Sequence, residues 1–295
     1  MPIINKKSES LMNHQAQKSH QIGDFLVTVL SDGEMNVSLA LLAGIDEKSA
    51  EKIQTDAGVI NADQIDINCY LIQSNGHTIL VDSGTGGLNH AGGLLLRNLA
   101  QLGIAPCDID TILITHAHPD HIGGLLDNEG KPVYENAKLY LHTLEVEYWQ
   151  NDYAFAQATE RGKRNFDLMR HTLNAYAQSL HLFDGHESIA GIRPILLAGH
   201  TPGHTGFQIG AGESSLLIWG DIVHFPYIQL DNPNVSIAFD YDSDQAKITR
   251  KKLLKQVAEQ KQLIAGMHIG KSGFAYIHSM EQKDRYEISY LNEPH

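Results

Sequence analysis

The sequence predicts an α/β fold in which two packed β-sheets carry helices on their outer faces. Short apolar strands alternate with segments of helical periodicity along the whole chain, which is the pattern of α/β proteins. No low-complexity linker divides the chain into two halves. We therefore expect a single domain over residues 23–295, preceded by a flexible tail over residues 1–22.

The first half of the chain is predicted to supply one sheet. The expected strands are residues 25–30, 67–72, 78–82, 110–115 and 138–142. Asn75-Gly76 lies between two of them and is a strong turn pair for a hairpin. Helices are expected over residues 94–102 and through Tyr148-Trp149. Residues 38–63 are predicted to form an inserted loop with a short helix that could overhang a site.

The second half repeats this alternation. The expected strands are residues 182–183, 192–197, 205–209, 216–219 and 263–268. Residues 165–181 have apolar positions at nearly helical spacing. Residues 244–260 are expected to form a long amphipathic helix. The apolar positions predicted to face inward in this helix are Ile248, Leu253, Leu254 and Val257.

The most informative stretch for function is the run from Thr115 to His121, which places four metal-capable side chains within six residues. They are His116, His118, Asp120 and His121. Burying such groups together is unfavourable unless a cation binds them, and imidazole with carboxylate suits Zn²⁺, Fe or Mn²⁺. The two histidines at spacing two point the same way on an extended backbone. Pro119 suits the first position of a helix, so these side chains can face two adjacent ions.

Three further candidate ligands follow apolar strands elsewhere in the chain. They are His200, Asp221 and His268. Sites in α/β folds collect at the carboxyl ends of strands, so we expect these side chains to meet the first cluster. His204 is predicted to be a hydrogen-bonding loop residue and His142 a structural residue, because a lone histidine seldom binds metal.

Composition narrows the function classes. The chain has 22 basic and 35 acidic side chains and a net charge of −13. No basic face is visible, which disfavours nucleic acid as a partner and favours a neutral small-molecule substrate. No apolar run approaches the roughly 20 residues that span a bilayer, so no membrane association is expected. Cys69 and Cys107 lie apart without a Cys-x-x-Cys spacing, which favours a reducing compartment over a disulfide framework or thiolate ligation.

The first 20 residues lack the apolar core of a signal peptide. We therefore expect a cytoplasmic location, and a leader removed from the natural chain would change this expectation.

The order His116-x-His118-x-Asp120-His121, His200, Asp221 and His268 resembles the metallo-β-lactamase superfamily, from about residue 24 to the C-terminus. Within it, four segments resemble methyl parathion hydrolase and related quorum-quenching N-acyl homoserine lactonases. These segments are residues 115–124, 199–205, 219–224 and 229–252. The resemblance implies a four-layered αββα sandwich, and it also suggests a homodimer.

The resemblance further implies a role for each ligand. One divalent ion takes His116, His118 and His200, the other takes Asp120, His121 and His268, and both Asp221 and a water-derived hydroxide bridge them. Zn²⁺ is the expected metal, with Mn²⁺, Fe²⁺ and Co²⁺ as alternatives. Asp120 is expected to relay a proton to the leaving group. Asp82 is expected to orient a ligand histidine from behind.

The function implied is a dinuclear metal-dependent hydrolase that opens lactones or cleaves activated esters. Phosphotriester cleavage is an expected side activity, and an organophosphate hydrolase of the methyl parathion type is the alternative main activity. The chain has no Gly-x-Ser-x-Gly elbow for a covalent mechanism. A non-catalytic, metal-stabilised binding protein is the alternative of another class, and it should have lost ligands that this chain retains.

Residues near the ligand loops are candidates for contact with substrate. They are Trp149, His224, Phe225 and Tyr227. The aromatic members of this set could form an apolar pocket together with Tyr148, Tyr153, Phe155, Leu39, Leu41 and Leu42. The run Asp240-x-Asp242-x-Asp244 lacks the later Gly and Glu of a calcium loop, so one of these aspartates is predicted to cap a helix.

Overall fold

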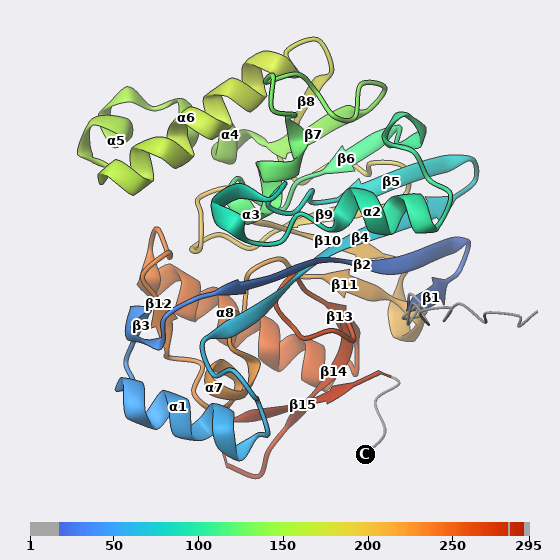
Figure 1. Ribbon diagram of the computed structural model, residues 1–295. Helices are drawn as coiled ribbons and strands as arrows, with labels where there is room; N and C mark the ends of the chain where they lie inside the picture. The colour runs from blue at the N-terminus through green and yellow to red at the C-terminus, as the bar shows by residue number, and fades with distance from the viewer. Residues whose placement is uncertain (1–17, 283, 292–295) are drawn as a thin grey trace, which may run out of the picture.

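Two large β-sheets pack face to face in the computed structural model, which describes residues 18–282 and 284–291 (Figure 1). The first sheet has seven strands: β1 (Ser19–Ile22), β2 (Phe25–Asn36), β4 (Gln64–Ser74), β5 (His77–Val81), β6 (Thr111–Leu113), β7 (Lys138–His142) and β8 (Leu180–Phe183), in that spatial order. The second has six, in the order β15 (Tyr286–Tyr290), β14 (Phe274–Ser279), β13 (Leu263–Ala265), β11 (Leu216–Ile218), β10 (Thr205–Ile209) and β9 (Arg193–Leu196). A small sheet pairs β3 (Leu42–Ala43) with β12 (Ser236–Ile237).

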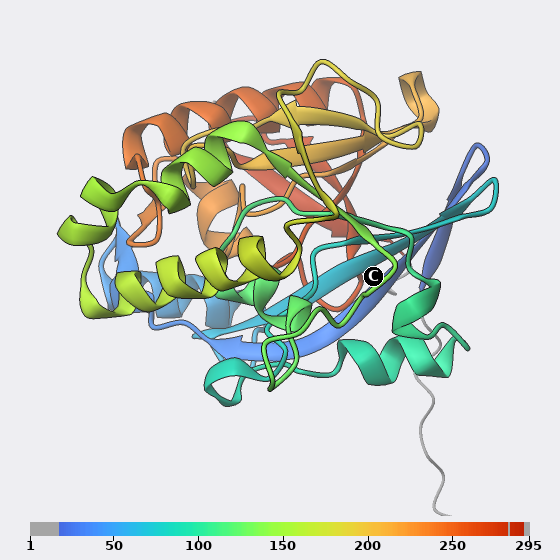
Figure 2. The same ribbon diagram turned by 90° about the horizontal axis from the view of Figure 1, so that it is seen from above.

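Helices cover the outer faces of both sheets. Five α-helices follow strands of the first sheet: α2 (Leu95–Gln101), α3 (Pro119–Ile122), α4 (Thr143–Gln150), α5 (Asp152–Gln157) and α6 (Glu160–Ala175). The others are α1 (Glu47–Asp56), α7 (Pro226–Asp231) and α8 (Ser243–Glu259). Short 3-10 turns occur at η1 (Leu39–Leu41), η2 (Leu88–His90), η3 (Pro106–Asp108), η4 (Gly123–Leu125) and η5 (Gly212–Ser214). Figure 2 shows α8 and α2 on opposite outer sides of the sheets.

The alternation of side chains along the strands explains these layers. In β4, Tyr70 and Ile72 pack into the cluster between the sheets, whereas Cys69 and Leu71 pack into the cluster beneath the helices. Successive strand residues point to opposite faces, and both faces are apolar because both are covered. The predicted four-layered αββα sandwich is confirmed.

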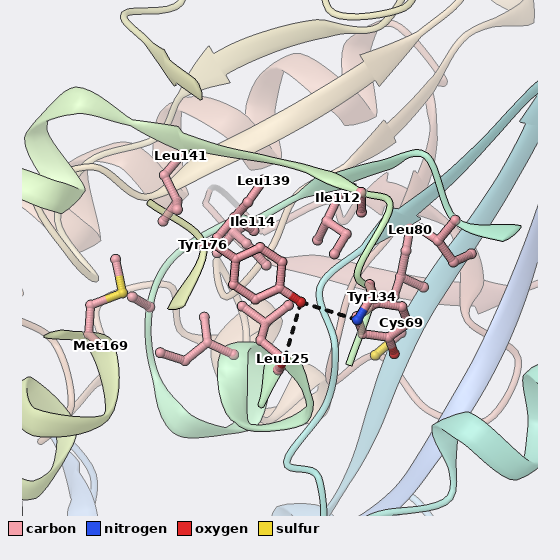
Figure 3. Close-up of a cluster of buried hydrophobic side chains, with 14 of the residues drawn as sticks. Cys69, Leu80, Ile112, Ile114, Leu125, Tyr134, Leu139, Leu141, Met169 and Tyr176 are labelled. Carbon is pink, nitrogen blue, oxygen red and sulfur yellow. Dashed lines mark hydrogen bonds between the residues drawn. The ribbon is translucent and has the colours of Figure 1, made fainter. Parts of the chain in front are cut away.

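The core beneath the helices of the first sheet is closed by aromatic and aliphatic side chains (Figure 3). The hydroxyl of Tyr176 accepts a hydrogen bond from the backbone N–H of Tyr134 at 3.3 Å and donates one to the carbonyl of Leu125 at 3.1 Å. A buried hydroxyl is thereby satisfied, and it ties α6 to the loops that follow α3.

Several boundaries differ from those expected. Residues 19–22 were assigned to a flexible tail, but they pair with β2 as strand β1. Residues 1–17 of that predicted tail lie outside the described residues. The helix expected over residues 165–181 spans Glu160–Ala175, because the Thr159 hydroxyl caps its start by accepting the Gly162 N–H at 3.1 Å.

Helix α8 follows the predicted range closely, but the prediction of which residues face inward is wrong at one position. Ile248 is 61% exposed, and a charged side chain occupies the core instead. The guanidinium of Arg250 is buried and donates hydrogen bonds to the carbonyls of Ile222, Pro233 and Val235 at 2.6, 3.1 and 2.8 Å. Backbone carbonyls therefore satisfy this buried charge and hold the loop after β11 against the helix.

The predicted hairpin at Asn75-Gly76 is confirmed, with Ser74 paired to His77 and positive φ values of 47° and 82° at the two turn residues. The predicted insertion at residues 38–63 contains η1, β3 and α1. It packs around Phe225 and Ile228 in a cluster of its own. No helix within the described ranges has the length and apolar composition needed to cross a lipid bilayer.

Candidate metal centre

The seven predicted ligands meet at one edge of the sandwich, where strands from both sheets end. His116 and His118 follow β6, and Asp120 and His121 lie in the first turn of α3. The other three follow β9, β11 and β13 of the second sheet: His200, Asp221 and His268. Segments more than 150 residues apart in the sequence therefore supply one cluster.

His116, His118 and His200 form the three-imidazole group. The Nδ1 atom of His118 lies 3.0 Å from Nε2 of His116 and 3.0 Å from Nε2 of His200. Their ligand atoms lie within 4.8 Å of one another, as a single cation requires. His118 is partly exposed, and the other two side chains are buried.

Asp120, His121 and His268 form the mixed group. Oδ2 of Asp120 lies 3.4 Å from Nε2 of His121 and 3.5 Å from Nε2 of His268. Asp120 is partly exposed, and the two histidines are buried. Carboxylate and imidazole together again suit a divalent cation.

Asp221 lies between the two groups. Its Oδ2 atom is 3.8 Å from His116 Nε2, 3.5 Å from His200 Nε2, 3.3 Å from His121 Nε2, and 3.2 Å from both His268 Nε2 and His224 Nε2. This one carboxylate oxygen therefore faces imidazoles of both groups, which is the position of a ligand shared by two ions.

Two unpaired atoms test whether the residues fit metal ions. His121 Nε2 and Asp221 Oδ1 are buried and have no hydrogen-bond partner. Leaving such atoms unpaired costs about 1–3 kcal/mol each, and coordination would satisfy them. The donor set and its convergence fit two divalent cations.

The charges of the cluster depend on each other. Burial raises the pKa of Asp120 and of Asp221, but His121 and His268 outweigh burial and hold both pKa values well below the ordinary range. Burial lowers the pKa of His268, whereas Asp221 and Asp120 outweigh it and raise the value to about 10. The metal-free cluster thus retains protons that cation binding would release.

Asp82 lies directly behind the mixed group, as predicted. His121 donates from Nδ1 to Oδ2 of Asp82 at 2.6 Å. The backbone N–H and hydroxyl of Thr115 also donate to this carboxylate, at 2.8 and 2.7 Å. These bonds fix the tautomer of His121 and turn its Nε2 towards the cluster.

Asp240 supports the three-imidazole group, and the sequence reasoning missed it. His200 donates from Nδ1 to Oδ1 of Asp240 at 2.8 Å. The prediction for this run of aspartates was a helix cap, and Asp242 is that cap, accepting N–H bonds from Asp244 and Gln245. The only sequence signal for Asp240 was its place beside the cap.

The structure places His204 in a supporting position, in agreement with the prediction. Its Nδ1 donates to the carbonyl of Leu197 at 3.0 Å, and its Nε2 accepts the backbone N–H of Asp221 at 2.9 Å. His204 therefore holds the backbone at Asp221. His142 accepts the N–H of Leu144 at the start of α4, which is also structural.

Two of the four predicted substrate contacts are buried aromatic side chains. Phe225 is fully buried in the cluster around α1 and α7. Trp149 lies in α4 and packs against Phe166 of α6 and against His118, with ring centroids 4.8 and 5.9 Å away. Its indole N–H donates to Glu145 at 2.8 Å. Both side chains are buried, and contact of either with a substrate stays a prediction. Tyr227, at the start of α7, is partly exposed and stays a prediction.

His224 lies against the cluster, beside His200 and Asp221, and its contact with a substrate stays a prediction. Its ring stacks on that of His268 with centroids 5.4 Å apart, and its buried Nδ1 has no partner. Beyond it, the ring of Phe239 lies 6.4 Å away. Tyr241 is 60% exposed, and its ring packs against that of Tyr148 with centroids 4.8 Å apart. The sequence reasoning did not select Phe239 or Tyr241, because they stand in a polar stretch.

Residues 62–268 match the family model of the metallo-beta-lactamase superfamily, and the chain belongs to that superfamily. This match covers most of the chain and includes all seven clustered side chains.

Two solved structures are similar over almost the whole chain. The hydrolase AbOPH of the β-lactamase superfamily is 28% identical, with a TM-score of 0.87 over 95% of this chain and 98% of that chain. AidC, a dizinc quorum-quenching lactonase in complex with the product N-hexanoyl-L-homoserine, is 26% identical, also with a TM-score of 0.87 over 95% and 98% of the two chains.

Among curated proteins, the uncharacterized protein YobT of Bacillus subtilis (strain 168) is 28% identical over 141 residues, which are 48% of this chain and 56% of YobT. The matched region thus spans about half of the length of that relative.

Proposed function

We propose that this protein is a dinuclear metal-dependent hydrolase that opens lactones, with N-acyl homoserine lactones as the first substrate class. The observation that carries the proposal is the convergence of the three-imidazole group and the mixed group on one oxygen of Asp221. The likeness to the lactonase AidC supports the choice of substrate.

The residues of each group define where cations would bind. The three-imidazole group would hold one ion, the mixed group would hold the other, and Asp221 would contact both. Bound divalent cations supply a hydroxide nucleophile at neutral pH and a sink for the charge that develops on the substrate oxygen. Zn²⁺ is the expected metal, and Mn²⁺, Fe²⁺ and Co²⁺ suit the same donors.

The side chains of the protein position the reaction and move its proton. Asp120 is the partly exposed carboxylate of the cluster. An Oδ atom of Asp120 can take the proton that the nucleophile carries and return it to the leaving alkoxide as the ring C–O bond of the lactone breaks. Asp82 and Asp240 hold His121 and His200 in fixed tautomers, so the ligands need no rearrangement during turnover.

The same centre suits activated esters and phosphotriesters. A trigonal carbonyl carbon and a tetrahedral phosphorus both need a positioned nucleophile and a charge sink. We therefore include ester and phosphotriester cleavage as secondary activities, with lactone opening as the main one.

The test compares the metal-loaded protein with the same protein after chelation. Acid release from N-hexanoyl and N-decanoyl homoserine lactones, an aryl ester and a dialkyl aryl phosphate would be followed under both conditions. We expect the lactones to give the highest kcat/KM and chelation to abolish turnover. A metal-loaded protein that cleaves none of these substrates would refute the proposed enzymatic function and favour a binding protein. A phosphotriesterase rate above the lactonase rate would make phosphotriester cleavage the main activity.

A further inference from the structure

Glu145 lies in α4 and is almost fully buried, at 1% exposure. Its carboxylate accepts four hydrogen bonds: from the N–H of Ala117 at 2.8 Å, the indole N–H of Trp149 at 2.8 Å, the hydroxyl of Thr201 at 2.6 Å and the N–H of Gly203 at 3.0 Å. Burying a carboxylate is costly, so four donors arranged around one carboxylate mark a position that the fold maintains.

The donors connect Glu145 to both loops of the three-imidazole group. Ala117 stands between His116 and His118 in the loop after β6. Thr201 follows His200 directly in the loop after β9. These two loops leave different sheets, and each oxygen of Glu145 holds one of them. Oε1 accepts from the first loop and Oε2 from the second.

The close approach of α4 to the second loop depends on a glycine. A Cβ atom on Gly203 would lie 2.4 Å from the backbone nitrogen of Glu145. The loop can therefore reach the carboxylate only because this residue has no side chain.

We propose that Glu145 is a positioning residue that sets the spacing between His118 and His200 and thereby controls binding of the ion in the three-imidazole group. This inference rests on the proposed two-metal centre. Glu145 acts through Ala117, Thr201 and Gly203, and none of these four hydrogen bonds goes to a ligand side chain.

The mixed group has separate supports, so the effect of Glu145 is selective. Asp82 holds His121, and His268 donates from Nδ1 to the carbonyl of Asp66 at 2.7 Å. Loss of Glu145 therefore leaves the orientation of these two histidines intact.

The isosteric change Glu145→Gln tests the role. A glutamine replaces one carboxylate oxygen by an amide NH2 that cannot accept a hydrogen bond. Either Thr201 and Gly203 of the second loop lose their acceptor, or Ala117 of the first loop and Trp149 lose theirs. Removing the outer partner of a metal ligand typically weakens metal binding by about 10- to 100-fold. We expect the first ion to leave Glu145→Gln at a chelator concentration lower by about that factor, with release of the second ion unchanged.

Two companion variants separate positioning from stability. Thr201→Val keeps the charge of Glu145 and removes one bond to the His200 loop, so we expect a smaller shift in the same direction. Tyr176→Phe removes a buried hydroxyl of the same core that bonds Tyr134 and Leu125 (Figure 3). We expect it to lower the melting temperature without changing either metal-release step.

The measurement is metal content per chain after dialysis against graded chelator, with melting temperatures measured in parallel. An anomalous difference map of partly depleted Glu145→Gln crystals should place the retained ion in the mixed group. Release of both ions together in Glu145→Gln and Thr201→Val, or release profiles equal to wild type, would overturn the inference. A wild-type chain that binds no metal would instead refute the proposed function, and this inference with it.

Discussion

Replacing Asp240 by asparagine should weaken metal binding without unfolding the protein. Asp240 accepts the Nδ1–H of His200 at 2.8 Å, and its side chain has no exposed surface. Its second oxygen accepts the backbone N–H of Ile237 at 3.2 Å. An asparagine can keep only one of these two acceptors and carries no charge, so His200 loses its fixed orientation or the loop loses its anchor.

The size of the effect follows from the environment of the carboxylate. Burial raises the pKa of Asp240, but the hydrogen bond from His200 and neighbouring positive charge outweigh burial and lower it from 3.8 to about 2. That displacement corresponds to roughly 2–3 kcal/mol in favour of the charged form. Hydrogen bonds to charged groups contribute a similar amount, about 1.5–3 kcal/mol. Since about 1.4 kcal/mol is a factor of ten, metal binding at His200 should weaken by roughly 10- to 100-fold.

Competition with a chromophoric chelator would measure the affinity, and Asp242→Asn provides the matched control. Asp242 undergoes the same chemical change two residues away, but it caps α8, where asparagine performs equally well. Its metal affinity and melting temperature should match wild type. Equal affinities for Asp240→Asn and Asp242→Asn would refute the reasoning.

Three further predictions concern turnover, backbone and acid stability. Asp120→Asn should lower kcat by at least about 100-fold even at metal concentrations at which two ions per chain are measured, and a near-normal rate would remove its proton-transfer role. Gly220→Ala should lower the free energy of unfolding, measured by urea denaturation, by roughly 1–3 kcal/mol. The reason is that φ of Gly220 is +61° and a Cβ atom there would lie 2.3 Å from His204 Nε2; an unchanged urea midpoint would contradict this. Burial, followed by the charge of His200, lowers the pKa of His204 to about 3, whereas the pKa in an unfolded chain is about 6.5. Unfolding therefore takes up a proton, and the free energy of unfolding decreases as the pH drops below about 6.5. Between pH 7 and 5, chelated wild type should therefore lose about 2 kcal/mol more than His204→Gln, and parallel losses would refute the assignment.

The ligand positions could be predicted because each depends on local sequence. The spacing of His116, His118 and Asp120 places them at one strand end, and His200 and Asp221 follow apolar strands of their own. An apolar run that stops at a polar residue is a pattern that a single segment carries. The αββα layers follow from the same patterns, since strands with two apolar faces require cover on both sides.

The supports of these ligands could not be predicted, because they depend on distant segments. Glu145 looks like an ordinary helix residue until folding brings the loops at Ala117 and Thr201 to it. Arg250 takes a core position in α8 because three carbonyls from another segment accept its hydrogen bonds. Ile248, two residues earlier, consequently faces solvent. Periodicity indicates which faces are apolar, but it gives no information about the partner of a buried charge.

Anomalous diffraction from crystals of the zinc-loaded protein, recorded at the zinc edge, tests the central claim most directly. Two peaks should appear roughly 3.5–4 Å apart. One should lie in the three-imidazole group and the other in the mixed group, with Asp221 between them. A map without peaks at this edge of the sandwich, or with a single ion that the two groups share, would contradict the two-metal centre.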